Sequence, residues 1–434
     1  MKKLMFSTLS LVMVLFAGGC GKFDFINSAE SKGKEEITLK IAWWGEKPRH
    51  DYTLEVIKLF EEKYPHIHID PLYANWDDYW KRLAPMAAAN QLPDIVQMDL
   101  LYLRPYSDNE LLEDLTPYIE QNVIETESIN ESILTGGKID KSLFGIPLGM
   151  NAPAIIIDRK LLYQAVNGFP KPNWSWSDFE EMVVEIHKEK GIYGTNGMKS
   201  PDVFFSYYLR SNGQSLYNKN GTGLGYEEDQ LFIDYFKMQL RMVEKGAFPR
   251  PDVTENIKRI EDELIVTGQS PLQWVFSNQY FGFLEATNRQ LDLVPLPGPG
   301  QELGLSVKPS MLFSMSKSSK NKEAAALFIN FFVNDIEANR LIEGERGVPI
   351  SSKVVEKIGK DLSEDHKKVF DYVNKVKNTS RNVEKADPLG SMEVVKKLQE
   401  VSEQILFKRI TPKEGAEIFR SEATKILSKQ NNSK

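Results

Sequence analysis

The stretch that decides the fold runs from residue 36 to residue 99 and reads EITLKIAWW (36–44), HDYTLEVIKLFEEKYP (50–65), HIHIDPLY (66–73), WDDYWKRLAPMAAANQ (76–91) and LPDIVQMD (92–99). The three short segments are rich in β-branched and aromatic residues, which predicts strands. The two longer segments place apolar residues at helical spacing, and Pro65 ends the first of them. The order βαβαβ is typical of a parallel sheet with helices on both faces.

Two adjacent tryptophans, Trp43 and Trp44, close the first of these strands, and Gly45 and a run of charged residues follow them. Successive side chains of a strand point to opposite faces, so the two rings cannot serve one purpose by simple packing. Because both faces of a covered parallel sheet are buried, both positions can nevertheless be apolar. We expect Trp43 to pack between the sheet and a helix, and Trp44 to be the ring nearer the carboxyl edge of the sheet.

The rest of the chain continues to alternate strands and helices. A strong apolar run spans residues 143–162, and strands are predicted within 270–284 and 310–315. Helices are predicted near 177–190, over 202–213, 229–246, 256–268 and 322–342, and over most of 360–429.

The composition is that of a soluble globular protein, with 41% hydrophobic and 26% charged residues. A length of 434 residues suggests about two domains. The net charge of −7 argues against nucleic acid and anionic membrane surfaces as partners.

The first twenty residues, MKKLMFSTLSLVMVLFAGGC, combine two lysines, an uncharged apolar stretch and small residues before a cysteine. This pattern predicts a secretory signal over residues 1–19. The end of the segment resembles a bacterial lipobox, which implies cleavage before Cys20 and attachment of lipid to its thiol. Cys20 is the only cysteine, so the chain cannot form an intramolecular disulfide. Residues 20–36 are polar and predict a flexible tether.

Several segments taken together resemble the extracellular solute-binding lipoproteins of carbohydrate ABC importers. They are ITLKIAWWG (37–45), NWDDYWKRLAPMAAANQLPDIVQMD (75–99), GKIDKSLFGIPLGMNAPAIIIDRKLL (137–162), WSWSDFEE (174–181), SKNKEAAALFINFFVND (319–335) and GERGVP (344–349). The resemblance covers essentially the whole chain after the signal. Within that family, the sequence looks most similar to bacillus proteins for pectin-derived, rhamnogalacturonan-type oligosaccharides.

The resemblance implies an α/β, periplasmic-binding-protein-like fold of two lobes joined by a hinge, with a ligand cleft between them. We expect one lobe at 37–152 plus 308–345 and the other at 153–307 plus 346–430. It also implies a monomeric receptor, lipid-anchored on the extracellular face of the cell membrane, that delivers an oligosaccharide to two permease subunits with a separate ATPase. No cofactor is expected.

A sugar site needs aromatic rings that stack on the apolar face of a pyranose and planar polar groups that bracket its hydroxyls. We expect such residues where strands end. Asn151 is the exception, because it is expected where the chain of this family passes the cleft. The candidates are Trp44, Asn75, Trp76, Asp77, Gln97, Asp99, Tyr102, Trp274, Phe276, Ser277, Asn278, Gln279 and Asn151. Trp44 is expected to be a sugar platform, with Trp44→Ala weakening binding far more than the fold.

A galacturonate carboxylate would call for a cation, and a bidentate arginine would meet it best. The charged candidates near the expected cleft are Lys47, Arg49, His50, Lys308 and Arg346, with Glu46 on the same loop as the first three. For each of them an ordinary solvated charge or surface ion pair is the competing interpretation.

Other kinds of function find less support in the sequence. His66, His68 and Asp70 alternate along one strand face, but a solvated face explains them, and five histidines supply no second ligand cluster for a metal. Adjacent acids such as Asp77 and Asp78 do not make the spaced carboxylate pair of a glycosidase. A secreted polysaccharide lyase or hydrolase remains the alternative to a receptor, and a cell-wall adhesin is a third possibility.

Overall fold

The computed structural model describes residues 35–166, 168–380 and 383–431. The chain divides into the segment Met1–Glu35 and the body Glu36–Lys434, and the description below concerns the body. The predicted signal 1–19, the lipid-bearing Cys20 and nearly all of the predicted tether 20–36 lie outside the described residues. Among the residues described, no helix combines the length and apolar character needed to cross a membrane.

The first sheet has five strands in the order β2-β1-β3-β12-β6. Strands β1, β2 and β3 are parallel, as the alternating pattern predicts, with Trp43 opposite Tyr73 and Trp44 opposite Ala74. Strand β12 runs antiparallel to β3, and β6 pairs antiparallel with β12, so the sheet is mixed. Its strands are β1 (Ile37–Trp44), β2 (Ile67–Ala74), β3 (Ile95–Met98), β6 (Ile146–Pro147) and β12 (Leu312–Met315).

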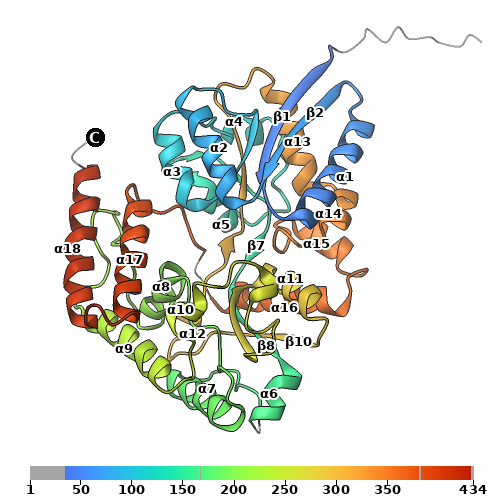
Figure 1. Ribbon diagram of the computed structural model, residues 1–434. Helices are drawn as coiled ribbons and strands as arrows, with labels where there is room; N and C mark the ends of the chain where they lie inside the picture. The colour runs from blue at the N-terminus through green and yellow to red at the C-terminus, as the bar shows by residue number, and fades with distance from the viewer. Residues whose placement is uncertain (1–34, 167, 381–382, 432–434) are drawn as a thin grey trace, which may run out of the picture. The chain divides into compact units, whose positions relative to one another are not determined.

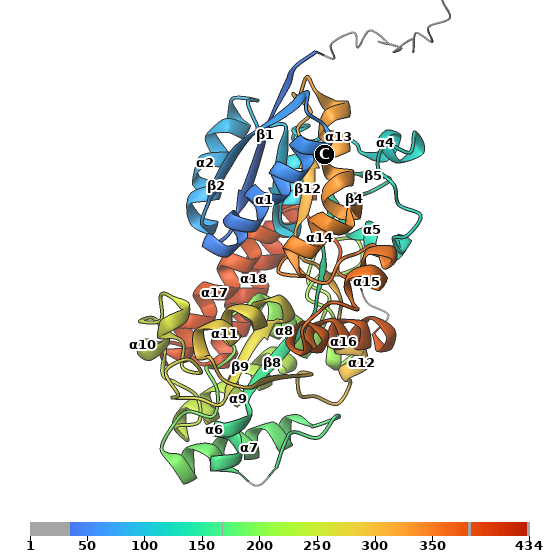
Figure 2. The same cartoon turned by 90° about the vertical axis from the view of Figure 1, so that its right-hand side faces the viewer.

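Helices cover this sheet, with α2 on one side and α1, α13 and α14 on the other (Figures 1 and 2). Proline at the start of α1 and the Asn75 side chain at the start of α2 fix where these helices begin. The helices of this part are α1 (Lys47–Lys63), α2 (Trp76–Ala88), α3 (Leu100–Asp108), α4 (Thr116–Glu120), α5 (Glu131–Leu134), η1 (Thr135–Gly137), α13 (Lys322–Asn334), α14 (Ile336–Ile342) and α15 (Ser352–Ile358).

Short two-stranded ladders connect the larger elements. Strand β4 (Lys138–Ile139) pairs with β5 (Ser142–Leu143), and β7 (Met150–Asn151) pairs with β11 (Lys308–Pro309). In the second ladder Lys308 lies opposite Asn151. The chain enters the second sheet directly after β7.

The second sheet has three antiparallel strands in the order β10-β8-β9. Its central strand is buried along its whole length, which explains the apolar run seen in the sequence. The strands are β8 (Pro153–Asp158), β9 (Leu272–Phe276) and β10 (Leu291–Val294). The helices of this part are α6 (Arg159–Ala165), α7 (Trp176–Lys190), α8 (Pro201–Ser211), α9 (Gln230–Glu244), α10 (Pro251–Thr254), η2 (Ile260–Asp262), η3 (Ser277–Gln279), α11 (Tyr280–Thr287), α12 (Gln301–Gly304), α16 (Glu364–Thr379), α17 (Ser391–Leu406) and α18 (Pro412–Asn431).

One sequence-based expectation is wrong in this part, and another holds only for the first half of its segment. The helix expected over 256–268 is reduced to the single 3-10 turn η2, where the Asp262 side chain accepts hydrogen bonds from the backbone N–H groups of Lys258 and Arg259. The strand expected within 270–284 ends at Phe276, whose backbone N–H donates to the Gln279 side chain at 2.8 Å, and α11 then begins. The Ser277 backbone N–H still donates to the Ala152 carbonyl at 2.9 Å, and the chain then turns through η3 into α11.

Candidate functional site

An aromatic cluster lies where the parallel strands β1, β2 and β3 end. The ring centroids of Trp44 and Trp76 are 5.0 Å apart and the rings are perpendicular. Tyr102, from α3, stacks on Trp80, from α2, at 3.6 Å with an interplanar angle of 11°, and it lies 6.2 Å from Trp76. Because both helices start directly after their strands, the rings gather at the carboxyl edge of the sheet.

Within this cluster Trp76 is the exposed ring. Its side chain is 40% exposed, whereas Trp44 is 7% exposed and lies against Trp76, Tyr79 and Trp80. Trp44 therefore packs beneath Trp76, and a sugar could contact little more than the edge of the Trp44 ring. Trp43 is fully buried, as the alternation along β1 suggests.

The polar neighbours of Trp76 begin helices. The Asn75 side chain accepts a hydrogen bond from the Asp78 backbone N–H at 3.0 Å, and the Asp99 carboxylate accepts one from Leu101 at 2.9 Å. Asp77 is exposed, and its side chain forms no hydrogen bond to the described part of the chain. Each group keeps lone pairs for further contacts.

Lys308, on β11, connects the first sheet to the second. Its ammonium lies 3.7 Å from the Asp99 carboxylate and 5.3 Å from the centroid of the Phe276 ring. The first contact is an ion pair longer than a hydrogen bond and the second is a cation–π contact. Among the described residues no acceptor is hydrogen-bonded to this ammonium, so its three donors remain available.

Four carboxylates surround Lys308. Burial lowers the pKa of the lysine, but attraction to Asp99, Glu384, Asp202 and Asp387 outweighs burial and leaves this pKa above its ordinary value. Burial, with repulsion from Glu384, raises the pKa of Asp387 to about 7. Burial likewise raises the pKa of Asp202. The group therefore holds more negative than positive charge when all of its members are ionised.

The candidates around the end of β9 differ in accessibility. Trp274 and Ser277 are buried, and the Ser277 hydroxyl accepts from the Ala152 backbone N–H at 3.2 Å. Phe276 is half-buried beside Lys308. Asn278 donates to the Glu345 carbonyl at 3.4 Å, while Gln279 bonds to the backbone of Phe276 as described above.

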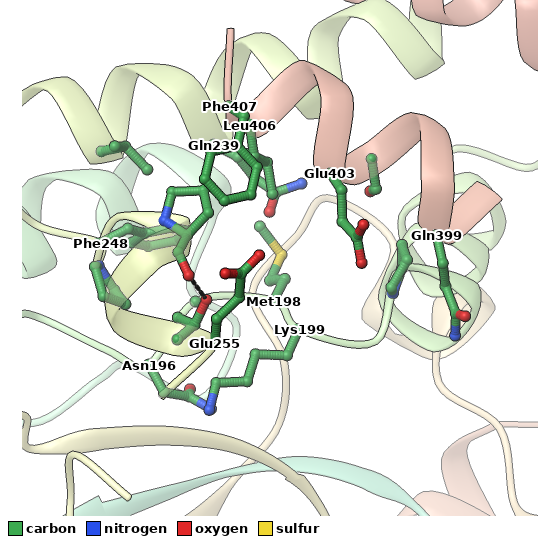
Figure 3. A pocket seen from close by; sticks show the side chains of 17 residues that line it. Asn196, Met198, Lys199, Gln239, Phe248, Glu255, Gln399, Glu403, Leu406 and Phe407 are labelled. Atoms are coloured by element: carbon green, nitrogen blue, oxygen red, sulfur yellow. Dashed lines mark hydrogen bonds between the residues drawn. The ribbon is translucent and has the colours of Figure 1, made fainter. Parts of the chain in front are cut away.

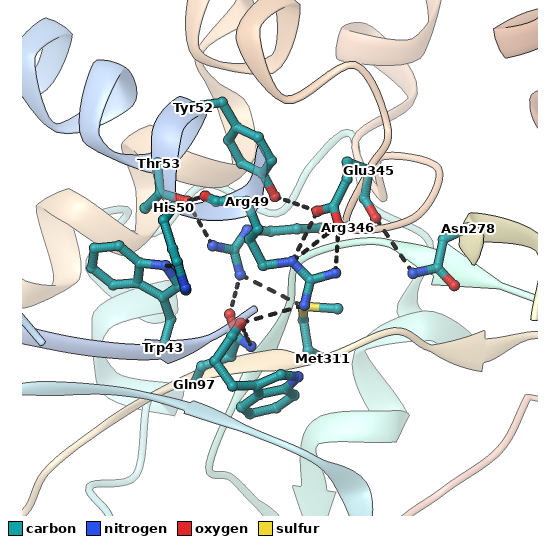
Figure 4. Close-up of polar contacts among 11 residues, drawn as sticks. Trp43, Arg49, His50, Tyr52, Thr53, Gln97, Asn278, Met311, Glu345 and Arg346 are labelled. Atoms are coloured by element: carbon teal, nitrogen blue, oxygen red, sulfur yellow. Dashed lines mark hydrogen bonds and ion pairs between the residues drawn. The ribbon is translucent and has the colours of Figure 1, made fainter. Parts of the chain in front are cut away.

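A buried ionic network joins α1 to the loop after α14 (Figure 4). The Arg49 guanidinium donates to both oxygens of the Glu345 carboxylate, at 2.9 Å and 2.7 Å, and to the Trp44 carbonyl at 3.4 Å. Tyr52 also donates to Glu345. Burial raises the pKa of Glu345, but Arg49 outweighs burial and leaves this pKa below its ordinary value. Arg49 already has a fixed carboxylate partner.

Arg346 is fully buried in the same network. It donates to the side chains of Gln97 and, at 2.8 Å, Thr53, and Gln97 donates in turn to the Trp44 carbonyl at 3.2 Å. Burial lowers the pKa of Arg346, though such a group stays charged. Arg346 and Gln97 thus present no surface to a ligand in this arrangement.

The remaining candidates lie around the start of α1 and on β7. Glu46 and Lys47 are exposed, and Lys47 pairs with Asp51. His50 accepts a hydrogen bond from the Trp43 indole at 3.1 Å, which requires an unprotonated Nδ1, and burial lowers its pKa. Asn151 is buried, and its side-chain oxygen has no partner among the described residues.

The ionic network and the group around Lys308 contain residues that were not candidates in the sequence. Glu345, Tyr52 and Thr53 complete the ionic network, and Asp202, Glu384 and Asp387 complete the group around Lys308. Glu345 directly precedes the candidate Arg346, but no feature of the sequence indicates that Glu345 pairs with Arg49, which lies 296 positions away. Among the described residues, no group of three or more His, Cys, Asp or Glu side chains is placed to hold a metal ion.

Comparison with known proteins identifies relatives of this chain. The family of bacterial extracellular solute-binding proteins matches residues 46–338. An uncharacterised ABC transporter extracellular-binding protein of Pyrococcus horikoshii is 25% identical over 333 residues, which cover 73% of this chain and 75% of that protein.

Two solved structures share the fold. A family 1 extracellular solute-binding protein of Alicyclobacillus acidocaldarius is 29% identical, with a TM-score of 0.69 and coverage of 91% of this chain and 100% of that one. A periplasmic oligogalacturonide-binding protein of Yersinia enterocolitica, solved with saturated digalacturonic acid, is 20% identical, with a TM-score of 0.80 and coverage of 91% and 99%. These matches confirm the two-lobed α/β fold expected from the sequence. Since the family match spans well over half of the chain, the protein belongs to the bacterial extracellular solute-binding proteins.

Proposed function

We propose that this protein is the receptor of a carbohydrate ABC importer and that its solute is a pectin-derived oligosaccharide of the rhamnogalacturonan type. Membership of the family establishes solute binding, and the relative from Pyrococcus horikoshii is named as part of an ABC transporter. The related protein of Yersinia enterocolitica binds an oligogalacturonide. The choice of a sugar for this chain rests on its own residues.

The observation that carries the proposal is a row of neighbouring groups from the first sheet to the second. The row consists of Trp76, Tyr102, Asp99, Lys308 and Phe276. Aromatic rings cover the apolar face of a pyranose, and the carboxylate and ammonium can bond to its hydroxyls. A row with rings at both ends and polar groups between them suits an extended ligand of more than one sugar unit.

The proposed uronate contact is Lys308. Arg49 and Arg346 are buried with partners, and Lys47 is exposed beside Asp51, whereas the Lys308 ammonium has unused donors. A charge-assisted hydrogen bond from an ammonium to a carboxylate is stronger than one to a neutral hydroxyl. The surrounding acids oppose this contact, and protonation of Asp387 removes part of that opposition.

Transport requires the ligand to change the balance between open and closed forms. A ligand that contacts only one lobe cannot shift that balance. The proposed lobes are 37–152 plus 308–345 and 153–307 plus 346–430, so Trp76 and Phe276 belong to different lobes. The closed form would then engage the permease subunits, and the proposed lipid on Cys20 would keep the receptor at the membrane.

Calorimetric titration tests the proposal. The mature chain is titrated with di- to hexasaccharides of three kinds: rhamnogalacturonan, homogalacturonan and neutral galactan. Saturable binding that is tightest for rhamnogalacturonan supports the full proposal. If neutral galactan binds as tightly as rhamnogalacturonan, the proposed uronate contact is wrong, although the proposal of a sugar ligand still holds. Binding of no sugar in the panel would overturn the sugar proposal.

A second measurement separates a receptor from an enzyme. The protein is incubated with the same oligosaccharides and the mixture is chromatographed. A receptor returns each oligosaccharide intact, whereas a lyase or hydrolase produces shorter chains. An adhesin would bind the polymer as well as it binds short oligomers.

A further inference from the structure

A cavity of about 290 Å³ lies in the second part of the molecule, between the 196–201 loop, α9, α10 and α17 (Figure 3). Met198, Phe248, Leu406 and Phe407 supply apolar walls. None of the lining residues belongs to the row from Trp76 to Phe276. The volume is near the lower end of small-molecule sites, which suits a ligand of about monosaccharide size.

Three buried polar side chains line the cavity with atoms that have no partner. Gln239 is 3% exposed and Ser402 is 6% exposed, and neither side chain is hydrogen-bonded to any residue that the structure describes. The Asn196 oxygen accepts from the Trp274 backbone N–H at 3.1 Å, while its amide nitrogen donates to no described residue. Polar groups inside a protein are normally satisfied, and a molecule in the cavity can bond to these three.

Two carboxylates without partners lie at the edge of the cavity. Glu255 and Glu403 are exposed lining residues, and neither forms an ion pair within the described chain. Lys199, also in the lining, pairs with Glu263 at 3.3 Å and therefore does not neutralise them. The Arg409 guanidinium lies over the Phe407 ring at 5.0 Å and likewise pairs with neither carboxylate. The edge carries two uncompensated negative charges.

We propose that this cavity is a second binding site and that it takes a small primary amine bearing hydroxyl or amide groups. The ammonium lies between Glu255 and Glu403, and the neutral polar groups reach Gln239, Asn196 and Ser402. The apolar face of the ligand lies against Met198 and Phe248. A ligand carboxylate is repelled at the same edge.

Saturation-transfer NMR and calorimetry on the mature full chain test this site with three probes of equal size: D-glucosamine, D-glucose and D-glucuronate. We expect glucosamine to bind with a roughly millimolar Kd. We expect glucose to bind up to about fivefold more weakly, since one partly exposed ion pair contributes on that scale, and glucuronate not to bind. Equal signals for all three probes would overturn the proposal.

Variants connect the binding to this cavity. Glu403→Gln and Glu255→Gln should each weaken glucosamine about fivefold and leave glucose unchanged. Gln239→Leu should weaken both sugars, and Glu417→Gln, on the exposed face of α18, should change neither. If both glutamate variants bind glucosamine like the wild type, glucosamine binds elsewhere and the proposed site is wrong. The glutamate variants decide the question even if Gln239→Leu fails to fold, because they change exposed side chains.

Discussion

The Lys308 ammonium lies 3.7 Å from the Asp99 carboxylate, in a contact that brings β11 to the end of β3. The lysine is held by attraction to four carboxylates, yet no described residue takes a hydrogen bond from it. Neighbouring carboxylates attract this cation, but none of them accepts a hydrogen bond from it. Its donors can therefore bond to an acceptor on a ligand.

Replacing this cation should abolish a preference for uronates. Lys308→Met keeps much of the aliphatic side chain and removes the charge. We expect affinity for digalacturonate and for rhamnogalacturonan oligosaccharides to fall about ten- to a hundredfold, the scale of one hydrogen bond to a charged group. Affinity for neutral galactan should change little. Calorimetry measures each value, and an undiminished uronate affinity would remove Lys308 from the site.

The exposed ring of the aromatic cluster should matter more for binding than for folding. Trp76→Ala should reduce oligosaccharide affinity at least about tenfold, because a stacking ring is lost. Trp44→Ala should lower the free energy of unfolding by about 3–5 kcal/mol, as expected for a buried tryptophan. Tyr163→Ala is the matched control, since Tyr163 is 52% exposed on α6, away from the cluster. If Trp76→Ala binds sugar like wild type, the ring is not a platform.

Asp387 should make stability depend on pH. Its pKa is about 7 in the folded protein against an ordinary value of 3.8. Between these values the folded state holds a proton that the unfolded state has lost, so the free energy of unfolding falls as pH rises. Asp387→Asn removes this contribution. The stability of the variant relative to wild type should therefore rise from about pH 4 to about pH 7 and then level off, as measured by urea unfolding. A constant difference would contradict the raised pKa.

The same carboxyl group should couple uronate binding to pH. Ionised Asp387 repels a ligand carboxylate and competes for Lys308, whereas protonated Asp387 does neither. Digalacturonate affinity should therefore decrease as pH rises through about 7, and galactan affinity should not. In Asp387→Asn the dependence should vanish. Persistence of the same pH profile in that variant would assign it to another group.

The ionic network between α1 and the loop after α14 should contribute strongly to stability. Glu345→Ala leaves the buried Arg49 guanidinium without its carboxylate, and we expect a loss of about 3–5 kcal/mol in the free energy of unfolding. Asp51→Ala, which removes the exposed pair with Lys47, should change it by less than about 0.5 kcal/mol. Chemical denaturation of both variants makes the comparison, and similar small effects would mean that the network is not tightly formed.

The sequence was sufficient for the parallel strands of the first sheet, β1, β2 and β3, because the signals for them are local. The strand and helix periods of residues 37–98 and the caps at Asn75 and Asp99 all lie within a few residues of the elements they define. The antiparallel pairing of β12 with β3 could not be predicted in this way. This pairing joins residues more than two hundred positions apart, and the spacing of apolar residues along the chain does not indicate which strands become neighbours.

The candidate site was predictable in type but not in detail. Alternation along β1 separates Trp43 from Trp44, but only the approach of α2 decides that Trp76 covers Trp44. Arg49 and Arg346 resemble free cations in the sequence, and their pairing with Glu345 and Gln97 depends on contacts between distant segments. Asp202 and Asp387 meet Lys308 for the same reason.

The most direct test of the central claim is calorimetric titration of one rhamnogalacturonan oligosaccharide into wild type, Trp76→Ala, Lys308→Met and the double variant. If one ligand contacts both residues, the wild type binds one oligosaccharide per chain, each single variant loses affinity and the double variant loses more than either. Saturable binding that is equal in all four proteins, or no binding to the wild type, would contradict the account.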